Sequence, residues 1–151
     1  RQKADVFVTG DIPSDGKIQS LHPAIRMKAT NFIKDANASS GNTLIRVAQG
    51  QRTFAEQDAL YAKGRTAGGS IVTNAKGGFS NHNFGLAFDI VGITDKKIDY
   101  NLNWSTLSTL GNKRCVYITF FWLIPKSGTS VNRKRNFFIR VDLEIEYYLF
   151  Q

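Results

Sequence analysis

Apolar residues recur at helical spacing after Pro23 and predict the first clear element of the chain. A helix is expected from Pro23 to about Gly41, because proline suits the first helical position and glycine suits a helix end. His22 or Ser20 would provide its N-cap. The predicted apolar face consists of Ile25, Ala29, Phe32, Ile33 and Ala36. This face indicates a helix that packs against a core on one side.

Further elements follow up to residue 111. Thr53 and Glu56 form a capping-box pattern, which predicts the start of a second helix. The other predicted elements are strands over 43–49 and 86–91, a glycine-rich loop over 64–80 and a short helix over 104–110, and the second helix should run to about Lys63. The mixture predicts an α+β fold with a small antiparallel sheet and flanking helices, in a single domain over residues 1–151.

Residues 112–151 differ from the rest of the chain in composition. They hold one of the 13 glycines, nine of the 18 aromatic residues and the basic cluster Arg133–Arg135. Two runs, Val116–Ile124 and Phe137–Tyr148, predict strands. We therefore treat residues 112–151 as a divergent tail of the predicted domain.

The overall composition excludes several classes of protein. A hydrophobic content of 42% is too high for a disordered chain, and the longest apolar run, Val116–Ile124, is too short to span a bilayer. The lone Cys115 excludes an internal disulfide, and no signal peptide is visible at Arg1. A net charge of +8 favours an anionic partner: nucleic acid, a membrane surface or an anionic cell-wall polymer.

The segment Ser80–Asp89 carries the strongest candidate chemistry. A loop provides His82, and the strand that follows provides Asp89 from an apolar context. Imidazole nitrogen and carboxylate oxygen are both zinc ligands, and a catalytic zinc uses three protein ligands and a water. The spacing alone leaves an alternative open, in which His82 caps a turn and Asp89 ends a strand.

Several motifs in a fixed order resemble one known family. The matching segments are Gln49–Thr53, Glu56–Gln57, Leu60–Thr66, Ile71–Ala75, Gly77–Gly78 and Ser80-x-His82-x-x-Gly85-x-Ala87-x-Asp89. They resemble the zinc peptidases of bacterial peptidoglycan of the D-Ala-D-Ala carboxypeptidase type, in particular the L-alanyl-D-glutamate endopeptidases of phage endolysins and spore-forming bacteria. The resemblance covers about residues 20–111 and implies a zinc-dependent hydrolase of the peptidoglycan stem peptide.

The resemblance also implies roles for five residues. His82 and Asp89 would be zinc ligands, and Arg52 would bind a substrate carboxylate or polarise the scissile carbonyl. Ser80 would orient substrate or the neighbouring ligand, and Gln57 would line the site. The alternatives are a surface salt bridge for Arg52, a turn for Ser80 and a helix-surface position for Gln57.

The tail departs from the family pattern. Relatives end with an acidic residue shortly before a second histidine that completes the zinc site, but this chain has two histidines in all, His22 and His82. His22 falls at the start of the first predicted helix, so the third ligand is not identified. A shifted reading frame or a replaced tail after Asn112 is the simplest account, and a divergent functional tail is the alternative.

Glu144 and Glu146 are weak candidates for the missing groups. On a strand they would share one face with Asp142, so one could act as third ligand and another as general base. The alternative is a solvated strand face. Because two protein ligands hold zinc poorly, we expect weak zinc binding and little or no peptidase activity.

The leading hypothesis is a zinc-dependent endopeptidase or carboxypeptidase that acts on the stem peptide. An inactive cell-wall-binding pseudoenzyme is the first alternative. A weaker one is nucleic-acid binding through tail residues of mixed basic and aromatic character, namely Lys126, Arg133–Arg135, Phe137 and Phe138. We expect a monomer that is exported to the periplasm or cell wall, or a phage-derived lysin.

Overall fold

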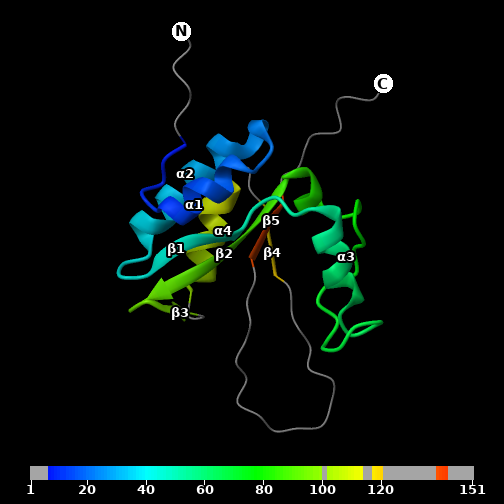
Figure 1. The fold of residues 1–151 in the computed structure, drawn as a ribbon. Coiled ribbons are helices and arrows are strands. Elements are labelled where there is room, and N and C mark those ends of the chain that lie inside the picture. Colours follow the sequence, from blue (N-terminus) through cyan, green and yellow to red (C-terminus); the bar gives the residue numbers. More distant parts are fainter. Residues whose placement is uncertain (1–6, 100–101, 114–116, 121–138, 143–151) are drawn as a thin grey trace, which may run out of the picture.

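The computed structural model describes residues 7–99, 102–113, 117–120 and 139–142 (Figure 1). The helices are α1 (Ile12–Gln19), α2 (Pro23–Ser39), α3 (Phe54–Ala62), α4 (Trp104–Lys113) and the 3₁₀ helix η1 (Asn81–Phe84). The strands are β1 (Leu44–Gln49), β2 (Ala87–Thr94), β3 (Lys97–Asp99), β4 (Tyr117–Phe120) and β5 (Ile139–Asp142). The predicted α+β class is confirmed. None of the helices in the described part of the chain is long and apolar enough to cross a membrane.

One antiparallel sheet organises the fold. Its strands follow the order β1-β2-β5-β4, and β3 pairs with the second half of β2. The predicted strands over 43–49 and 86–91 are confirmed as β1 and β2. Within the tail, β4 and β5 confirm part of each predicted strand run, and β5 pairs directly with β2. The remaining positions of both runs, with Glu144 and Glu146, lie outside the described residues.

The hydrophobic core lies between the sheet and the helices α1, α2 and α4 (Figure 1). The predicted face of α2 is confirmed, because all five of its apolar residues are buried. In the centre of the core, the rings of Phe32 and Phe88 meet edge to face, with centroids 6.2 Å apart. The His22 Nδ1 accepts the N–H of Ala24, so His22 is the N-cap of α2. These contacts hold β2 firmly beneath α2.

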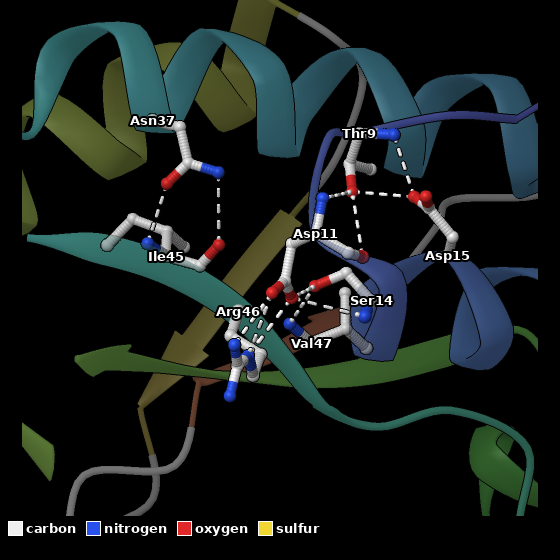
Figure 2. Close-up of polar contacts among 8 residues, drawn as sticks. All are labelled: Thr9, Asp11, Ser14, Asp15, Asn37, Ile45, Arg46 and Val47. Carbon is white, nitrogen blue, oxygen red and sulfur yellow. Dashed lines mark hydrogen bonds and ion pairs between the residues drawn. The ribbon is translucent and has the colours of Figure 1, made fainter. Parts of the chain in front are cut away.

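Helix α1 was not predicted from the sequence, and polar contacts fix it to β1 (Figure 2). The carboxylate of Asp11 accepts the backbone N–H and hydroxyl of Ser14, which caps the helix. The same carboxylate accepts hydrogen bonds from two nitrogens of Arg46 on β1, and the shorter bond joins Nη2 to Oδ1 at 2.7 Å. The Ser14 hydroxyl oxygen in turn accepts the N–H of Val47 at 2.9 Å. Helix and strand are therefore joined through one buried carboxylate.

Helix α3 begins at the predicted capping box, in which Thr53 and Glu56 satisfy each other's backbone N–H groups. The helix lies to the side of the sheet, away from α1 and α2 (Figure 1). Among the nine residues of α3, all of which the structure describes, Gln57 alone is buried. A helix with a single buried polar side chain is held by specific hydrogen bonds more than by apolar burial.

Candidate functional site

The central strand β2 presents Asp89 on the face opposite the core. Side chains alternate along a strand, so Phe88 and Ile90 enter the core while Asp89 points away from it. The pairing of β1 with β2 shifts register between Val47 and Gln49, which brings Gln49 opposite Asp89. A bulge of this kind ends regular pairing and redirects the chain, here into the segment that carries Gly50 and Arg52.

The imidazole of His82 lies between a backbone carbonyl and the Asp89 carboxylate. Its Nδ1 is 3.0 Å from the carbonyl oxygen of Gly50, and its Nε2 is 3.3 Å from Asp89 Oδ1. A carbonyl oxygen only accepts, so Nδ1 carries the proton and donates it to Gly50. The other ring nitrogen, Nε2, faces the carboxylate oxygen directly. A favourable contact between these two atoms needs a cation, either a proton on Nε2 or a metal ion.

Gly50 allows the close approach that orients His82. A Cβ atom at this position would lie 2.5 Å from the hydroxyl oxygen of Ser20 and 2.6 Å from the carbonyl oxygen of Lys17. The carbonyl of Lys17 belongs to the backbone of α1 and cannot turn away. Glycine is therefore required for the end of β1 to pass α1 and bring its carbonyl to the imidazole.

Arg52 connects the His82 segment to α3. Its backbone N–H donates to the carbonyl of His82 at 2.9 Å. Its Nη1 donates to Gln57 Oε1 at 2.8 Å, and its Nη2 lies 3.5 Å from Asp89 Oδ2. The capping box starts one residue later, so the direction of the Arg52 side chain is set by the beginning of α3. The structure thus brings together three of the predicted site residues, His82, Asp89 and Arg52.

Gln57 lies beside Arg52, and its burial is at odds with the alternative of a helix-surface position. Its side chain is 0% exposed. Its amide oxygen accepts from Arg52, and its amide nitrogen donates to Ala75 O at 2.7 Å and to Thr73 Oγ1 at 3.3 Å. Both ends of the amide bond to protein, so Gln57 supports Arg52 from behind, and a role in binding substrate stays a prediction.

Ser80 lies where the resemblance placed it, immediately before η1. It is buried, its N–H donates to Asn83 Oδ1 and its carbonyl accepts the N–H of Asn83. Ser80 therefore starts the turn that delivers His82. A role in orienting substrate stays a prediction.

Asn83 is a site-building residue that the sequence did not single out. Its side-chain oxygen accepts the N–H groups of Gly78 and Ser80. Its side-chain nitrogen donates to the carbonyls of Arg52 and Thr53 at 3.0 and 3.2 Å. One buried amide thus joins the glycine-rich loop and η1 to the Arg52 segment. A single asparagine in a loop carries no spacing signal, so only the contacts reveal it.

The described donor set fits zinc but is incomplete. A neutral imidazole with a fixed Nδ1 proton and an adjacent carboxylate are ordinary zinc ligands. Within residues 7–99, 102–113, 117–120 and 139–142, no group of three or more His, Cys, Asp or Glu side chains could hold a metal ion. His22 caps α2, as its predicted position indicated. The weak candidates Glu144 and Glu146 lie outside the described residues, so the third ligand stays unidentified.

Strand β2 of the antiparallel sheet carries Asp89, η1 carries His82, and Arg52 lies beside Asp89, so the site combines two possible metal ligands with a cation. Comparison with known proteins identifies the family. The chain matches the family model VanY, described as D-alanyl-D-alanine carboxypeptidase, over residues 18–118. This match covers more than half of the chain, which therefore belongs to the VanY family. The family prediction is confirmed, and enzymes of this family are generally zinc peptidases.

Two individual proteins are similar to this chain, one in sequence and one in fold. The chain is 46% identical over 78 residues to the peptidoglycan L-alanyl-D-glutamate endopeptidase CwlK of Bacillus subtilis (strain 168). That alignment covers 52% of this chain and 42% of CwlK, so the chain spans less than half the length of this relative. The crystal structure of the Serratia marcescens L-Ala D-Glu endopeptidase ChiX matches with a TM-score of 0.53 and 16% identity, covering 87% of this chain and 86% of ChiX. This second likeness supports the fold.

Proposed function

We propose that this chain acts on the stem peptide of bacterial peptidoglycan through a zinc-dependent site at His82, Asp89 and Arg52. Membership of the VanY family supports hydrolysis of a peptide bond, and the name of CwlK points to the L-Ala–D-Glu bond. The observation that carries the proposal is the position of His82 Nε2, 3.3 Å from an oxygen of the Asp89 carboxylate. An imidazole and a carboxylate this close together are suited to hold one zinc ion.

His82 and Asp89 would hold the zinc ion. When bound, zinc polarises a carbonyl and makes a coordinated water acidic enough to attack a peptide bond at neutral pH. Gly50 contributes by holding the proton on His82 Nδ1, which keeps Nε2 available. Asp89 contributes a negative charge that favours a metal cation over an empty site.

Arg52 is the group that would contact substrate. The Arg52 side chain is 14% exposed, and its guanidinium lies next to the candidate ligand Asp89. A planar cation at this position binds a substrate carboxylate or stabilises the oxygen that becomes negative in the transition state. Stem peptides contain carboxylates close to each bond that such enzymes cleave, so both roles fit the proposed substrate.

We further propose that the chain binds zinc weakly and turns substrate over slowly. The family ligand set needs a second histidine, and the two histidines of this chain are the N-cap His22 and the ligand His82. Each absent ligand removes one metal bond and leaves that position to water. The same observation favours the second candidate function, a wall-binding protein that retains the stem-peptide site without efficient catalysis. Glu144 or Glu146 remains the alternative source of a third ligand.

Zinc titration and product analysis together test the proposal. Zinc affinity is measured by competition with a chromophoric chelator, for the wild-type chain and for His82→Ala and Asp89→Asn. We expect weak zinc binding that both substitutions abolish. Purified peptidoglycan is then digested, and mass spectrometry distinguishes release of terminal D-Ala from cleavage between L-Ala and D-Glu. Zinc binding that is unchanged in both variants would contradict the proposed site.

The location and partners belong to the same proposal. A substrate in the cell wall requires export to the periplasm or wall, or release as a phage lysin. The net charge of +8 suits an anionic wall polymer, and we propose that the chain acts as a monomer. The basic and aromatic tail residues that suggested nucleic-acid binding lie outside the described residues. A salt-dependent gel shift with single-stranded DNA would reveal that alternative.

A further inference from the structure

The described residues include two arginine–aspartate pairs with different geometry. Arg46 closes on Asp11 with two nitrogens, at 2.7 Å from Nη2 and 3.0 Å from Nε. Arg52 approaches Asp89 with one nitrogen, Nη2, at 3.5 Å. Both aspartates are largely buried, and both arginines come from β1 or the segment directly after it. A buried carboxylate beside a guanidinium normally draws it into a short two-pronged contact, so the wider Arg52–Asp89 pair needs a cause.

Gln57 holds the other terminal nitrogen of Arg52. Its amide oxygen holds Arg52 Nη1 at 2.8 Å, which turns the guanidinium toward α3 and away from β2. The amide itself cannot follow the arginine, because its nitrogen donates to the carbonyl of Ala75 in the glycine-rich loop at 2.7 Å, and the longer contact to Thr73 Oγ1 is secondary. The side chain is completely buried, so it has no other position to adopt without leaving these partners unpaired. Arg52 is therefore tethered to a fixed point.

We propose that Gln57 is a positioning residue that keeps Arg52 from closing on Asp89 and so leaves the Asp89 carboxylate available to a metal ion. This inference rests on the proposed zinc site. A guanidinium that closed on Asp89 as Arg46 closes on Asp11 would occupy both carboxylate oxygens and neutralise the charge that attracts zinc. With the tether in place, Arg52 stays near enough to meet substrate and too far to displace the metal.

The test is a double-mutant cycle read out as zinc affinity. Gln57→Met has a similar volume but cannot accept from Arg52, so the guanidinium is expected to close on Asp89 and raise the zinc Kd about tenfold. Adding Arg52→Ala removes the competing cation, and the double variant should regain wild-type affinity. Arg52→Ala alone should leave the Kd within about twofold of wild type, because the tethered arginine does not compete. This single variant tests the idea even if Gln57→Met fails to fold.

Thr73→Val is the matched control, because it removes the other side-chain partner of Gln57 and leaves the bond to Arg52. Its zinc affinity should equal that of wild type. Three results would overturn the positioning role: an unchanged Kd in Gln57→Met, a weakened Kd that Arg52→Ala does not restore, or a clearly tighter Kd in Arg52→Ala alone. In each of these cases zinc binding that is lost in His82→Ala leaves the proposed function intact. If His82→Ala does not affect zinc binding, both proposals fail together.

Discussion

Arg52 contributes its backbone and its side chain to different parts of the site. Its N–H and carbonyl bond to His82 and Asn83 and hold η1 in place, whereas its guanidinium faces Gln57 and Asp89. Arg52→Ala keeps the backbone bonds and removes only the cation. We expect any peptidoglycan hydrolysis to fall by about 10²–10³-fold, as for loss of one group that stabilises the transition state, with little change in zinc affinity.

The measurement is the initial rate of product release from purified peptidoglycan, with zinc affinity measured on the same protein. Lys34→Ala is the control, because it removes the same charge from an exposed position of α2. An Arg52→Ala variant that hydrolyses as fast as the Lys34→Ala control would show that Arg52 is only an ion-pair partner.

Asn83 supports a stability prediction at the same scale. Asn83→Ala removes a side chain that bonds four backbone groups, two in the glycine-rich loop and two in the Arg52 segment. Leaving a single buried polar group unpaired costs about 1–3 kcal/mol, so we expect the free energy of unfolding to fall by at least about 2 kcal/mol. Urea denaturation measures this change. Asn42→Ala, at an exposed turn, is the comparison and should stay within about 0.5 kcal/mol of wild type.

Only those site residues that belong to recognisable sequence motifs were predicted from the sequence. His82, Asp89 and Arg52 stand in an order that resembles a known family, and the structure brings them together. Gln57 was assigned to the correct neighbourhood, but its complete burial and its bond to Arg52 could not be predicted, because sequence spacing gives the face of a helix and not the depth of a side chain. Asn83 was missed because its four partners come from segments that only the folded chain brings together.

Among the elements, α1 depends most on contacts distant in sequence. Burial raises the pKa of the Asp11 carboxyl. Hydrogen bonds from Arg46 and Ser14 lower this pKa by more than burial raises it, so the folded pKa lies below its ordinary value. A lowered folded pKa stabilises the protein above the unfolded pKa of about 4, and this stabilisation disappears as the pH falls through the folded pKa. The link between α1 and β1 should therefore weaken in acid.

Asp11→Asn tests that link. At pH 7 the variant should lose about 1–3 kcal/mol of unfolding free energy, because Arg46 and Ser14 lose a charged partner. At a pH below the folded pKa, where Asp11 is protonated in both states, wild type and variant should differ much less. Urea denaturation at the two pH values measures the difference, and Arg46→Gln should behave in the same way. An equal gap between wild type and Asp11→Asn at both pH values would contradict the assigned role of the carboxylate.

The same contacts explain why α1 could not be predicted while α2 could. Helix α2 has five buried apolar residues at regular spacing, which is a signal in the sequence itself. Helix α1 buries Ser14 and Ile18, contains Gly16 and leaves Ile12 85% exposed. The sequence of α1 therefore has no regular apolar face from which a helix could be predicted. Its stability comes from a carboxylate whose main partner, Arg46, is 35 residues away.

The contact between the end of β1 and α1 also limits substitution at Gly50. Gly50→Ala would place a Cβ against the Lys17 carbonyl, and we expect the free energy of unfolding to fall by about 1–3 kcal/mol. Displacement of the Gly50 carbonyl should also weaken zinc binding, because that carbonyl orients His82. Gly68→Ala is the matched control: a Cβ there meets nothing within 4 Å, and stability and zinc affinity should match wild type. Equal behaviour of the two variants would show that the close approach at Gly50 is unimportant.

At the scale of the whole molecule, the composition and the fold divide the chain differently. Glycine content and family motifs change near residue 112, which suggested a tail unrelated to the domain. The family match nevertheless extends to residue 118, and the tail strand β5 pairs with β2 along Ala87–Ile90, with Arg140 opposite Asp89. The described part of the tail therefore extends the sheet that carries the site.

Deleting residues 114–151 tests this conclusion. The deletion removes β4 and β5 and leaves the backbone groups of β2 beside Asp89 without a ladder partner on that side. An unpaired central strand is both less stable and prone to pair with other chains. We expect the free energy of unfolding, measured by urea denaturation, to fall by at least about 2 kcal/mol, with association visible by size-exclusion chromatography.

Deleting only residues 143–151 keeps β5 and removes Glu144 and Glu146. This shorter deletion should preserve stability, and it should weaken zinc binding only if one of those acids is the third ligand. A chain ending at residue 113 that stays as stable and monomeric as the full chain would show that the tail is a dispensable addition.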